Sequence, residues 1–304
     1  MSNAICEALG IPYPIILGGL SRIGRAPLTA AVSNAGGLGL LGAGSWTAEE
    51  FREQIRETRK LTDRIFGANI PGHAEEADEL VEVAIAERLK VISTSAGNPR
   101  RFAARLKEGG LYIIHVVSTV AQAMTAERAG VDAIVAEGSE SGGMTSMEQV
   151  STLVLVPQVA DAVGCPVIAA GGIADARGLA AAFALGAVGV QIGTLLMATK
   201  ECEVPPAFKE MMLRARETDT YLEPRGRAGS RMFKQDFSKT ALQDLKETNS
   251  PTLPDLDLVQ TGVGQVTGMI REVRSVAEVI GNMVGQAREI LPGLIANLSR
   301  ESGA

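Results

Sequence analysis

The chain has 304 residues, 46% apolar and 21% charged, and its 29 Lys and Arg against 35 Asp and Glu give a net charge of −6. This length allows about two domains or one large α/β barrel, and a pI of 5.2 argues against a protein that coats nucleic acid or binds anionic membranes. Three distant cysteines and two histidines make neither a disulfide framework nor a zinc site, so we expect no metal.

The first ten residues, MSNAICEALG, lack the basic and apolar segments of a secretory signal, so we expect a cytoplasmic protein. One apolar stretch, 179–198, has the length of a membrane span. Gly186, Gly189 and Gly193 interrupt it where short elements would join, so we interpret it as helix, turn and strand. Neither a membrane nor a nucleic acid is an expected partner.

Eight short apolar runs alternate with amphipathic runs along the first two thirds of the chain. In order they are PIILGG (14–19), GLGLLG (37–42), FGANI (66–70), VISTSAG (91–97), LYIIHVV (111–117), DAIVAEG (132–138), PVIAAGG (166–172) and AVGVQIG (187–193). Unbroken apolar runs are typical of parallel strands buried on both faces. Eight strand–helix units predict an α/β fold, the (β/α)8 TIM barrel, whereas a doubly wound sheet would use fewer strands.

The pattern changes after the eighth run. We predict that residues 1–204 and 263–304 form the barrel, and that 205–262 form a small, mostly helical insertion or lid after strand eight. A final helix, roughly 264–296 and broken near Pro292, would close the barrel. A separate linker followed by a tail is the alternative.

Glycine pairs follow the last two predicted strands, where TIM barrels commonly bind phosphate. In AAGGIAD, Gly171 and Gly172 come just past strand seven, and in QIGT, Gly193 and Thr194 come just past strand eight. Glycine lets backbone N–H groups approach an anion closely, and the N-terminus of a short helix adds a favourable dipole. We therefore predict a phosphate site here, with tight turns alone as the alternative.

Three further strand ends carry small or polar residues. LGGLSR offers Gly18 and Gly19 after strand one, where backbone would lie against a flat ligand. GANIPGH offers Asn69 after strand three, either to bond a polar ring edge or to cap a turn. EGSESGGMTS (137–146) follows strand six as a flexible, polar loop, for which a plain turn is the alternative.

Seven motifs, in this order, resemble the FMN-dependent family that includes nitronate monooxygenases (2-nitropropane dioxygenases), NADH:quinone reductases and flavin-dependent enoyl-acyl-carrier-protein reductases. They are PIILGGL (14–20), SNAGGLGLLGAG (33–44), FGANI (66–70), STSAGNP (93–99), ERAGVDAIVAEGSESGG (127–143), VIAAGGIADARGL (167–179) and GAVGVQIGTLLMATKEC (186–202). The likeness covers about residues 10–205 and weakens afterwards, although GQVTGMI (264–270) also resembles a late segment of the family.

The resemblance implies an FMN cofactor. Its phosphate would lie at the glycine pairs after strands seven and eight, and its ring against Gly18, Gly19 and Leu20, with Asn69 and Gln191 as polar partners. The predicted cofactor-binding residues are Gly18, Gly19, Leu20, Asn69, Glu137, Gly142, Gly143, Ala170, Gly171, Gly172, Gln191, Gly193 and Thr194. NADH or NADPH is the expected reductant.

One position departs from the family pattern. The strand-six loop of the family usually continues with a histidine, the proposed acid/base over the flavin, and here that position is Met144. Methionine cannot transfer a proton, but hydride exchange between nicotinamide and flavin needs no protein base. The catalytic residue is left undetermined: His73 and Glu140 are candidates, Met144 is an apolar contact on the flavin face, and we expect His115 to be buried and hydrogen-bonded.

A local excess of basic residues lies between 214 and 239. We interpret it either as a docking patch for a phosphorylated substrate (CoA, acyl-carrier protein or nicotinamide dinucleotide) or as a solvated face paired with nearby carboxylates.

The expected function is that of an FMN-dependent oxidoreductase that passes hydride from NAD(P)H to a quinone or an activated C=C bond, such as that of an enoyl thioester. The alternatives are a nitronate monooxygenase using O2, a flavin-binding protein with little turnover, and a non-redox barrel enzyme that binds phosphate. The expected partner is a small-molecule, acyl-CoA or acyl-carrier substrate. A homodimer is the first candidate for the oligomeric state.

Overall fold

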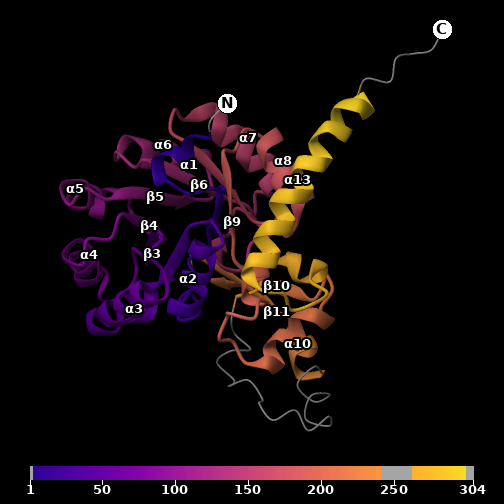
Figure 1. Cartoon of the computed structure of the whole chain (residues 1–304), viewed down its shortest axis with the longest axis horizontal. Coiled ribbons are helices and arrows are strands. Elements are labelled where there is room, and N and C mark those ends of the chain that lie inside the picture. The colour runs from indigo at the N-terminus through magenta and orange to yellow at the C-terminus, as the bar shows by residue number, and fades with distance from the viewer. Residues whose placement is uncertain (1–2, 227, 241–261, 299–304) are drawn as a thin grey trace.

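Eight parallel strands form a closed barrel at the centre of the molecule (Figure 1). The computed structural model describes residues 3–226, 228–240 and 262–298. The barrel strands are β1 (Ile15–Leu17), β2 (Gly39–Gly42), β3 (Phe66–Pro71), β4 (Val91–Ser95), β5 (Tyr112–Val117), β6 (Ala133–Glu137), β8 (Val167–Ala170) and β9 (Gly189–Ile192). Their order is β1-β9-β8-β6-β5-β4-β3-β2. The ring closes because Leu17 N–H donates to the Leu38 carbonyl and Leu38 N–H to the Ile15 carbonyl, both at 2.9 Å. The predicted TIM barrel is confirmed.

Burial explains why these segments form strands. Every residue of β1, β2, β3, β8 and β9 is buried. Side chains alternate between the barrel interior and the surrounding helices, so both faces of each strand need apolar residues. The unbroken apolar runs of the sequence meet that need.

Helices surround the barrel. They are α1 (Ala4–Leu9), α2 (Ala26–Asn34), α3 (Ala48–Leu61), α4 (Ala77–Ala86), α5 (Arg100–Glu108), α6 (Val120–Arg128), α7 (Thr152–Ala162), α8 (Ala176–Ala184), α9 (Thr194–Met197), α10 (Pro206–Arg214) and α13 (Val276–Leu298), with short 3-10 turns η1 (Ala43–Ser45) and η2 (Gln265–Met269). The stretch 179–198 is helix, turn and strand, as predicted, and ends in the short helix α9. Among the described residues, no helix has both the length and the apolar character needed to cross a membrane.

The last helix closes the barrel, but its bounds differ from those predicted. α13 packs against α8 and α2, and Figure 1 shows it in yellow along the outside of the barrel beside α8. It begins at Val276 rather than near residue 264, because 265–269 form η2. It also continues past Pro292, so the predicted break is wrong. Proline removes one backbone donor and bends a helix without always ending it.

The insertion after strand eight contains a β-hairpin that we did not predict. α10 and residues 235–240 are helical as expected, but β10 (Thr220–Arg225) and β11 (Ala228–Phe233) pair antiparallel. β11 also pairs with β7 (Gly143–Ser146), so the loop after strand six is partly a strand. The pairing of β11 with β7 joins segments more than 80 residues apart, which local patterning cannot reveal. Residues 241–261 of the predicted insertion lie outside the described part of the chain.

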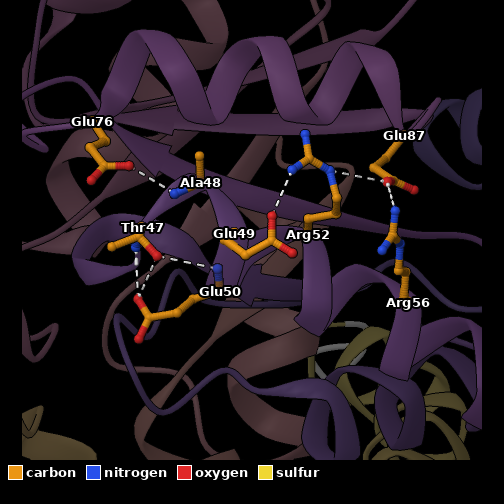
Figure 2. A network of polar contacts seen from close by, with 8 residues as sticks. All are labelled: Thr47, Ala48, Glu49, Glu50, Arg52, Arg56, Glu76 and Glu87. Carbon is orange, nitrogen blue, oxygen red and sulfur yellow. Dashed lines mark hydrogen bonds and ion pairs between the residues drawn. The ribbon is translucent and has the colours of Figure 1, made fainter.

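A polar network fixes α3 beside α4 (Figure 2). Thr47 and Glu50 form a capping box at the start of α3, a device worth about 1 kcal/mol. Glu76, just before α4, accepts from the backbone N–H of Ala48 at 2.8 Å. Glu87, just after α4, pairs with Arg52 and Arg56 of α3, although each such exposed pair contributes below about 1 kcal/mol. The two helices flank β3, which carries Asn69 to the mouth of the barrel.

Candidate active site

A cavity of about 1310 Å³ opens at the carboxyl ends of the barrel strands. This is the face where TIM barrels place their active sites. Its wall includes every residue that we singled out for binding or catalysis, namely Gly18, Gly19, Leu20, Asn69, His73, Glu137, Glu140, Gly142, Gly143, Met144, Ala170, Gly171, Gly172, Gln191, Gly193 and Thr194. The structure therefore brings these residues together, while their roles in binding stay predictions.

The glycines after β8 satisfy two different requirements. Gly171 and Gly172 have φ of +92° and +72°, which side chains other than glycine rarely adopt. A Cβ on Gly171 would lie 2.9 Å from the Gly138 carbonyl oxygen, so glycine is also needed for packing. A Cβ on Gly172 would meet nothing nearer than a Glu140 oxygen at 3.5 Å. The second glycine therefore leaves open space in the cavity wall, where backbone can meet a phosphate.

Glycines after β1 allow close approach of neighbouring strand ends. A Cβ on Gly18 would lie 3.4 Å from the Cα of Gly193, and one on Gly19 would lie 2.4 Å from the amide of Asn69. Asn69 is 3% exposed, and its Nδ2 donates to Ser93 Oγ at 3.2 Å. The wall here is thus smooth backbone with one fixed amide, a shape suited to a flat polar ring.

Two polar side chains, one on β9 and one just after it, retain unused hydrogen-bonding capacity. The Oε1 of Gln191 is buried and has no partner, and an unpaired buried acceptor costs about 1–3 kcal/mol. Thr194 Oγ1 accepts from Gly264 N–H at 2.9 Å, and among the described residues its own proton has no acceptor. A ring N–H would satisfy Gln191 and a phosphate oxygen would satisfy Thr194. The residues present therefore fit the FMN that the sequence resemblance implies.

Glu137 is the carboxyl group with the most unusual environment in this cavity. Burial raises its pKa to about 7, and the nearby Ser141 hydroxyl opposes that rise. Glu137 pairs in register with Ala170, which pairs with Gln191. Because paired residues of neighbouring strands face the same side, Glu137 and Gln191 flank the small Ala170 on the barrel interior. The raised pKa lets Glu137 keep a proton in the cavity at a higher pH than an ordinary glutamate does.

The carboxylate of Glu140 is already hydrogen-bonded to another residue of the barrel. Its carboxylate accepts from the backbone N–H of Thr152 at 3.0 Å and from the Thr152 hydroxyl at 3.0 Å. Thr152 is the first residue of α7, so the carboxylate lies where the helix dipole favours negative charge. These contacts favour a role in holding the strand-six loop over a role in proton transfer.

The remaining candidates differ in exposure. Met144 lies on β7 opposite Ser230 and is 49% exposed at the cavity wall. His73 is exposed on the loop after β3. His115 is buried, as predicted, with Nδ1 2.7 Å from Thr94 Oγ1, and burial lowers its pKa to about 4. Of the two histidines, His73 is the exposed one at the cavity wall.

Several basic residues between 214 and 239 pair with nearby carboxylates, which supports the second interpretation of that stretch. Arg216 pairs with Asp219 and Arg225 with Glu223. Arg231 is 7% exposed and donates to the Ser139 carbonyl at 3.0 Å and to Gln149 Oε1 at 3.2 Å. It anchors the hairpin to the strand-six loop and is not a surface docking residue.

The sequence interpretation missed three residues that hold the site together: Ser93, Thr152 and Gly264. Ser93 orients Asn69, Thr152 holds Glu140, and Gly264 holds Thr194. The motifs STSAGNP and GQVTGMI contain Ser93 and Gly264 without indicating these contacts, and no quoted motif contains Thr152. Within the described residues no group of His, Cys, Asp and Glu could hold a metal ion, and all three cysteines are free.

Comparison with known proteins gives the family. The family model for nitronate monooxygenase matches residues 2–80 and 72–253. A probable nitronate monooxygenase of Staphylococcus haemolyticus is 33% identical, with 83% of each chain covered. A Rhodococcus jostii (3aS,4S,5R,7aS)-5-hydroxy-7a-methyl-1-oxo-octahydro-1H-indene-4-carboxyl-CoA dehydrogenase is 37% identical over 72% of this chain. The alignment spans only 62% of that dehydrogenase.

Solved structures of the same family are also similar to this chain. FabK from Thermotoga maritima is 38% identical with a TM-score of 0.89, covering 98% of this chain and 99% of that one. A nitroalkane oxidase from Streptomyces ansochromogenes is 25% identical with a TM-score of 0.82, covering 96% and 99%. With the TIM barrel and the glycine-lined cavity at its strand ends, these matches show that the chain is an enzyme of the nitronate monooxygenase family of FMN-dependent oxidoreductases.

Proposed function

We propose that this enzyme carries hydride from NADH or NADPH to an activated C=C bond conjugated to an acyl thioester. The observation that carries the proposal is the cavity, which is glycine-lined at the strand ends and larger than the 300–1,000 Å³ or so of an ordinary ligand pocket. It has room for a flavin and a second ligand together. The likeness to FabK and to a carboxyl-CoA dehydrogenase favours a thioester over a quinone as the second ligand.

Different residues of the chain would bind the phosphate of FMN and orient its ring. Gly172, Gly193 and Thr194 bind the phosphate, and Gln191 and Asn69 orient the ring. The chemistry supplied by FMN when it is bound is hydride transfer between a nicotinamide and an electron-poor carbon. Met144 gives the acceptor an apolar contact and no proton.

Spectroscopy with stepwise mixing tests the proposal. The purified protein should be yellow, NADH or NADPH added without oxygen should bleach it, and an enoyl thioester should restore the colour faster than a quinone does. If neither NADH nor NADPH bleaches a flavin-loaded protein, neither of them is the hydride donor and this part of the proposal is refuted. If no acceptor restores the colour, the alternative of a flavin-binding protein with little turnover is favoured. A colourless, folded protein after supply of FMN would favour the non-redox barrel enzyme.

Gly172→Val tests the phosphate site. The valine side chain would fill the open part of the cavity wall, so the variant should be purified without bound flavin. Gly110→Val is the matched control, because Gly110 has the same φ of +72° and nothing within 4 Å of its Cβ position. The control carries the same backbone strain on the opposite face of the barrel and should keep its FMN. Stoichiometric FMN in Gly172→Val would overturn the assignment.

Oxidation of nitronates by O2 is the second candidate. The family match favours it, and a nitronate is already deprotonated, so Met144 is no obstacle. If the enzyme consumes oxygen with a nitronate and reduces no thioester, nitronate oxidation replaces thioester reduction as the proposed function.

We also propose that residues 205–262 act as a lid on the barrel formed by 1–204 and 263–304. In support, Arg225 and Ala228 of the hairpin line the cavity, and β11 pairs with β7 beside Met144.

A further inference from the structure

The cavity continues beyond the strand ends into a groove along α6. Ala121, Gln122, Thr125 and Arg128 line it, and their spacing of one, four and seven residues places them on one face of the helix. This face runs for about 10 Å, since an α-helix rises 1.5 Å per residue. The site for a flavin at the strand ends does not require such an extension.

The floor of the groove is the outer surface of β5. Ser93 and Ser95 contact Asn69 inside the barrel, so Thr94 between them faces outward. His115 pairs in register with Thr94 and therefore also faces outward, toward the helices. It lines the cavity while being only 4% exposed. α5 packs against α4 and α6 against α7, and His115 lies on the strand between these two pairs of helices, where it borders the cavity.

Two arginines at the groove lack the carboxylate partners found elsewhere on the molecule. On α5, Arg101 and Arg105 pair with Asp78, but the neighbouring Arg100 has no ion pair within the described residues and lines the cavity. The only polar side-chain contact of Arg128 there is with the Thr125 hydroxyl, at 3.3 Å. Each guanidinium therefore offers free donors that suit a phosphate.

We propose that this groove binds the phosphopantetheine arm of the thioester substrate. Resting on the proposed function, the inference places the acyl group at the cavity and the arm along α6. The amides of the pantetheine chain match the Ser118 hydroxyl and Gln122 Nε2, while Gln122 Oε1 accepts from Ser118 N–H and the Thr125 hydroxyl donates to the Ala121 carbonyl. The phosphate matches Arg100 and Arg128. Both CoA and a carrier protein present this arm, so the shared chemistry defines the site.

Kinetics with matched acceptors test it. The same enoyl group is supplied to the FMN-loaded enzyme on CoA, on a phosphopantetheinylated carrier protein and on N-acetylcysteamine, which lacks the phosphate. Arg100→Gln and Arg128→Gln should raise KM for the CoA thioester roughly tenfold more than for the N-acetylcysteamine thioester, the effect of losing a charge-assisted hydrogen bond. An equal effect on both acceptors overturns the inference.

The control is Arg64→Gln, which removes an exposed arginine, without an ion pair in the described part of the chain, at the amino end of β3. It should leave KM for both thioesters unchanged. A rise in KM for NADH in the groove variants, without a rise for CoA thioesters, would mean that the groove holds the dinucleotide and would also refute the proposal. A KM change with CoA but not with the carrier protein, or the reverse, identifies which source the groove serves.

A binding measurement separates this inference from the proposed function. Titration calorimetry with CoA itself needs no turnover. CoA binding that weakens in Arg100→Gln and Arg128→Gln, in an enzyme that reduces no thioester, would support the groove and refute the reaction. Thioester reduction with unchanged CoA affinity in both variants would refute the groove and leave the reaction standing.

Discussion

Gln191 is the residue whose hydrogen bonding most directly indicates that a ligand binds in the cavity. Its Oε1 is buried without a partner, so Gln191→Leu should raise the unfolding free energy of the flavin-free protein by about 1 kcal/mol. The same change should weaken FMN binding roughly tenfold, because the ring loses an acceptor. Chemical denaturation and flavin titration measure the two effects. Gln158→Leu, on the exposed face of α7, is the control, and an unchanged FMN affinity in Gln191→Leu would contradict the assignment.

Glu137 makes the stability of the flavin-free protein depend on pH. Because burial raises its pKa from 4.5 to about 7, the folded state binds more protons than the unfolded state between these values. Stability therefore falls as pH rises from about 4.5 to 7 and changes little above that. Glu137→Gln should remove this slope, and above pH 7 it should be more stable than the parent by up to on the order of 3 kcal/mol.

Urea denaturation at several pH values measures the slope. Glu53→Gln, which removes one exposed carboxylate on α3, controls for the change in net charge. If the parent and Glu137→Gln have parallel stability curves between pH 4.5 and 7, the carboxyl of Glu137 is better solvated than its burial implies.

At the scale of elements, the sequence predicts what is local and misses what is paired at long range. All eight barrel strands could be predicted, since burial on both faces leaves an unbroken apolar run. The hairpin β10–β11 could not: Glu223, Pro224 and Arg225 do not suggest a strand, and the third strand of the sheet lies at 143–146. The site follows the same rule, because the glycine pairs are visible in the sequence while the contact between Thr152 and Glu140 depends on folding.

The pairing of β7 with β11 yields a prediction about Met144. It fixes Met144 opposite Ser230 at the cavity wall, half exposed, with room for an imidazole. Met144→His should therefore create or raise activity on neutral nitroalkanes by roughly a hundredfold, as expected of a positioned general base. Oxygen consumption with a nitroalkane and with its nitronate anion measures the effect. Met147→His, three residues along and outside the cavity wall, should gain nothing, and a flavin-loaded Met144→His with unchanged activity would mean that the loop is placed differently.

At the scale of the whole molecule, the cavity is assembled from almost the entire chain. Its wall runs from Gly18 after the first strand to Val266 before the last helix, and the barrel closes only where β1 meets the segment before β2. No fragment of the chain contains the site, so ligand binding should be coupled to global folding rather than to one local segment.

That coupling makes thermal unfolding a test of which ligand the cavity takes. FMN at about 100 times its Kd should raise the unfolding free energy by about 2.7 kcal/mol, which corresponds to roughly 4 °C in Tm for a chain of this length. The rise should grow with the logarithm of FMN concentration in the parent and be absent in Gly172→Val. Inorganic phosphate should give a smaller rise, because it fills only the site at the glycine pairs. If FMN gives no rise while another phosphorylated metabolite does, the cavity belongs to a non-redox reaction.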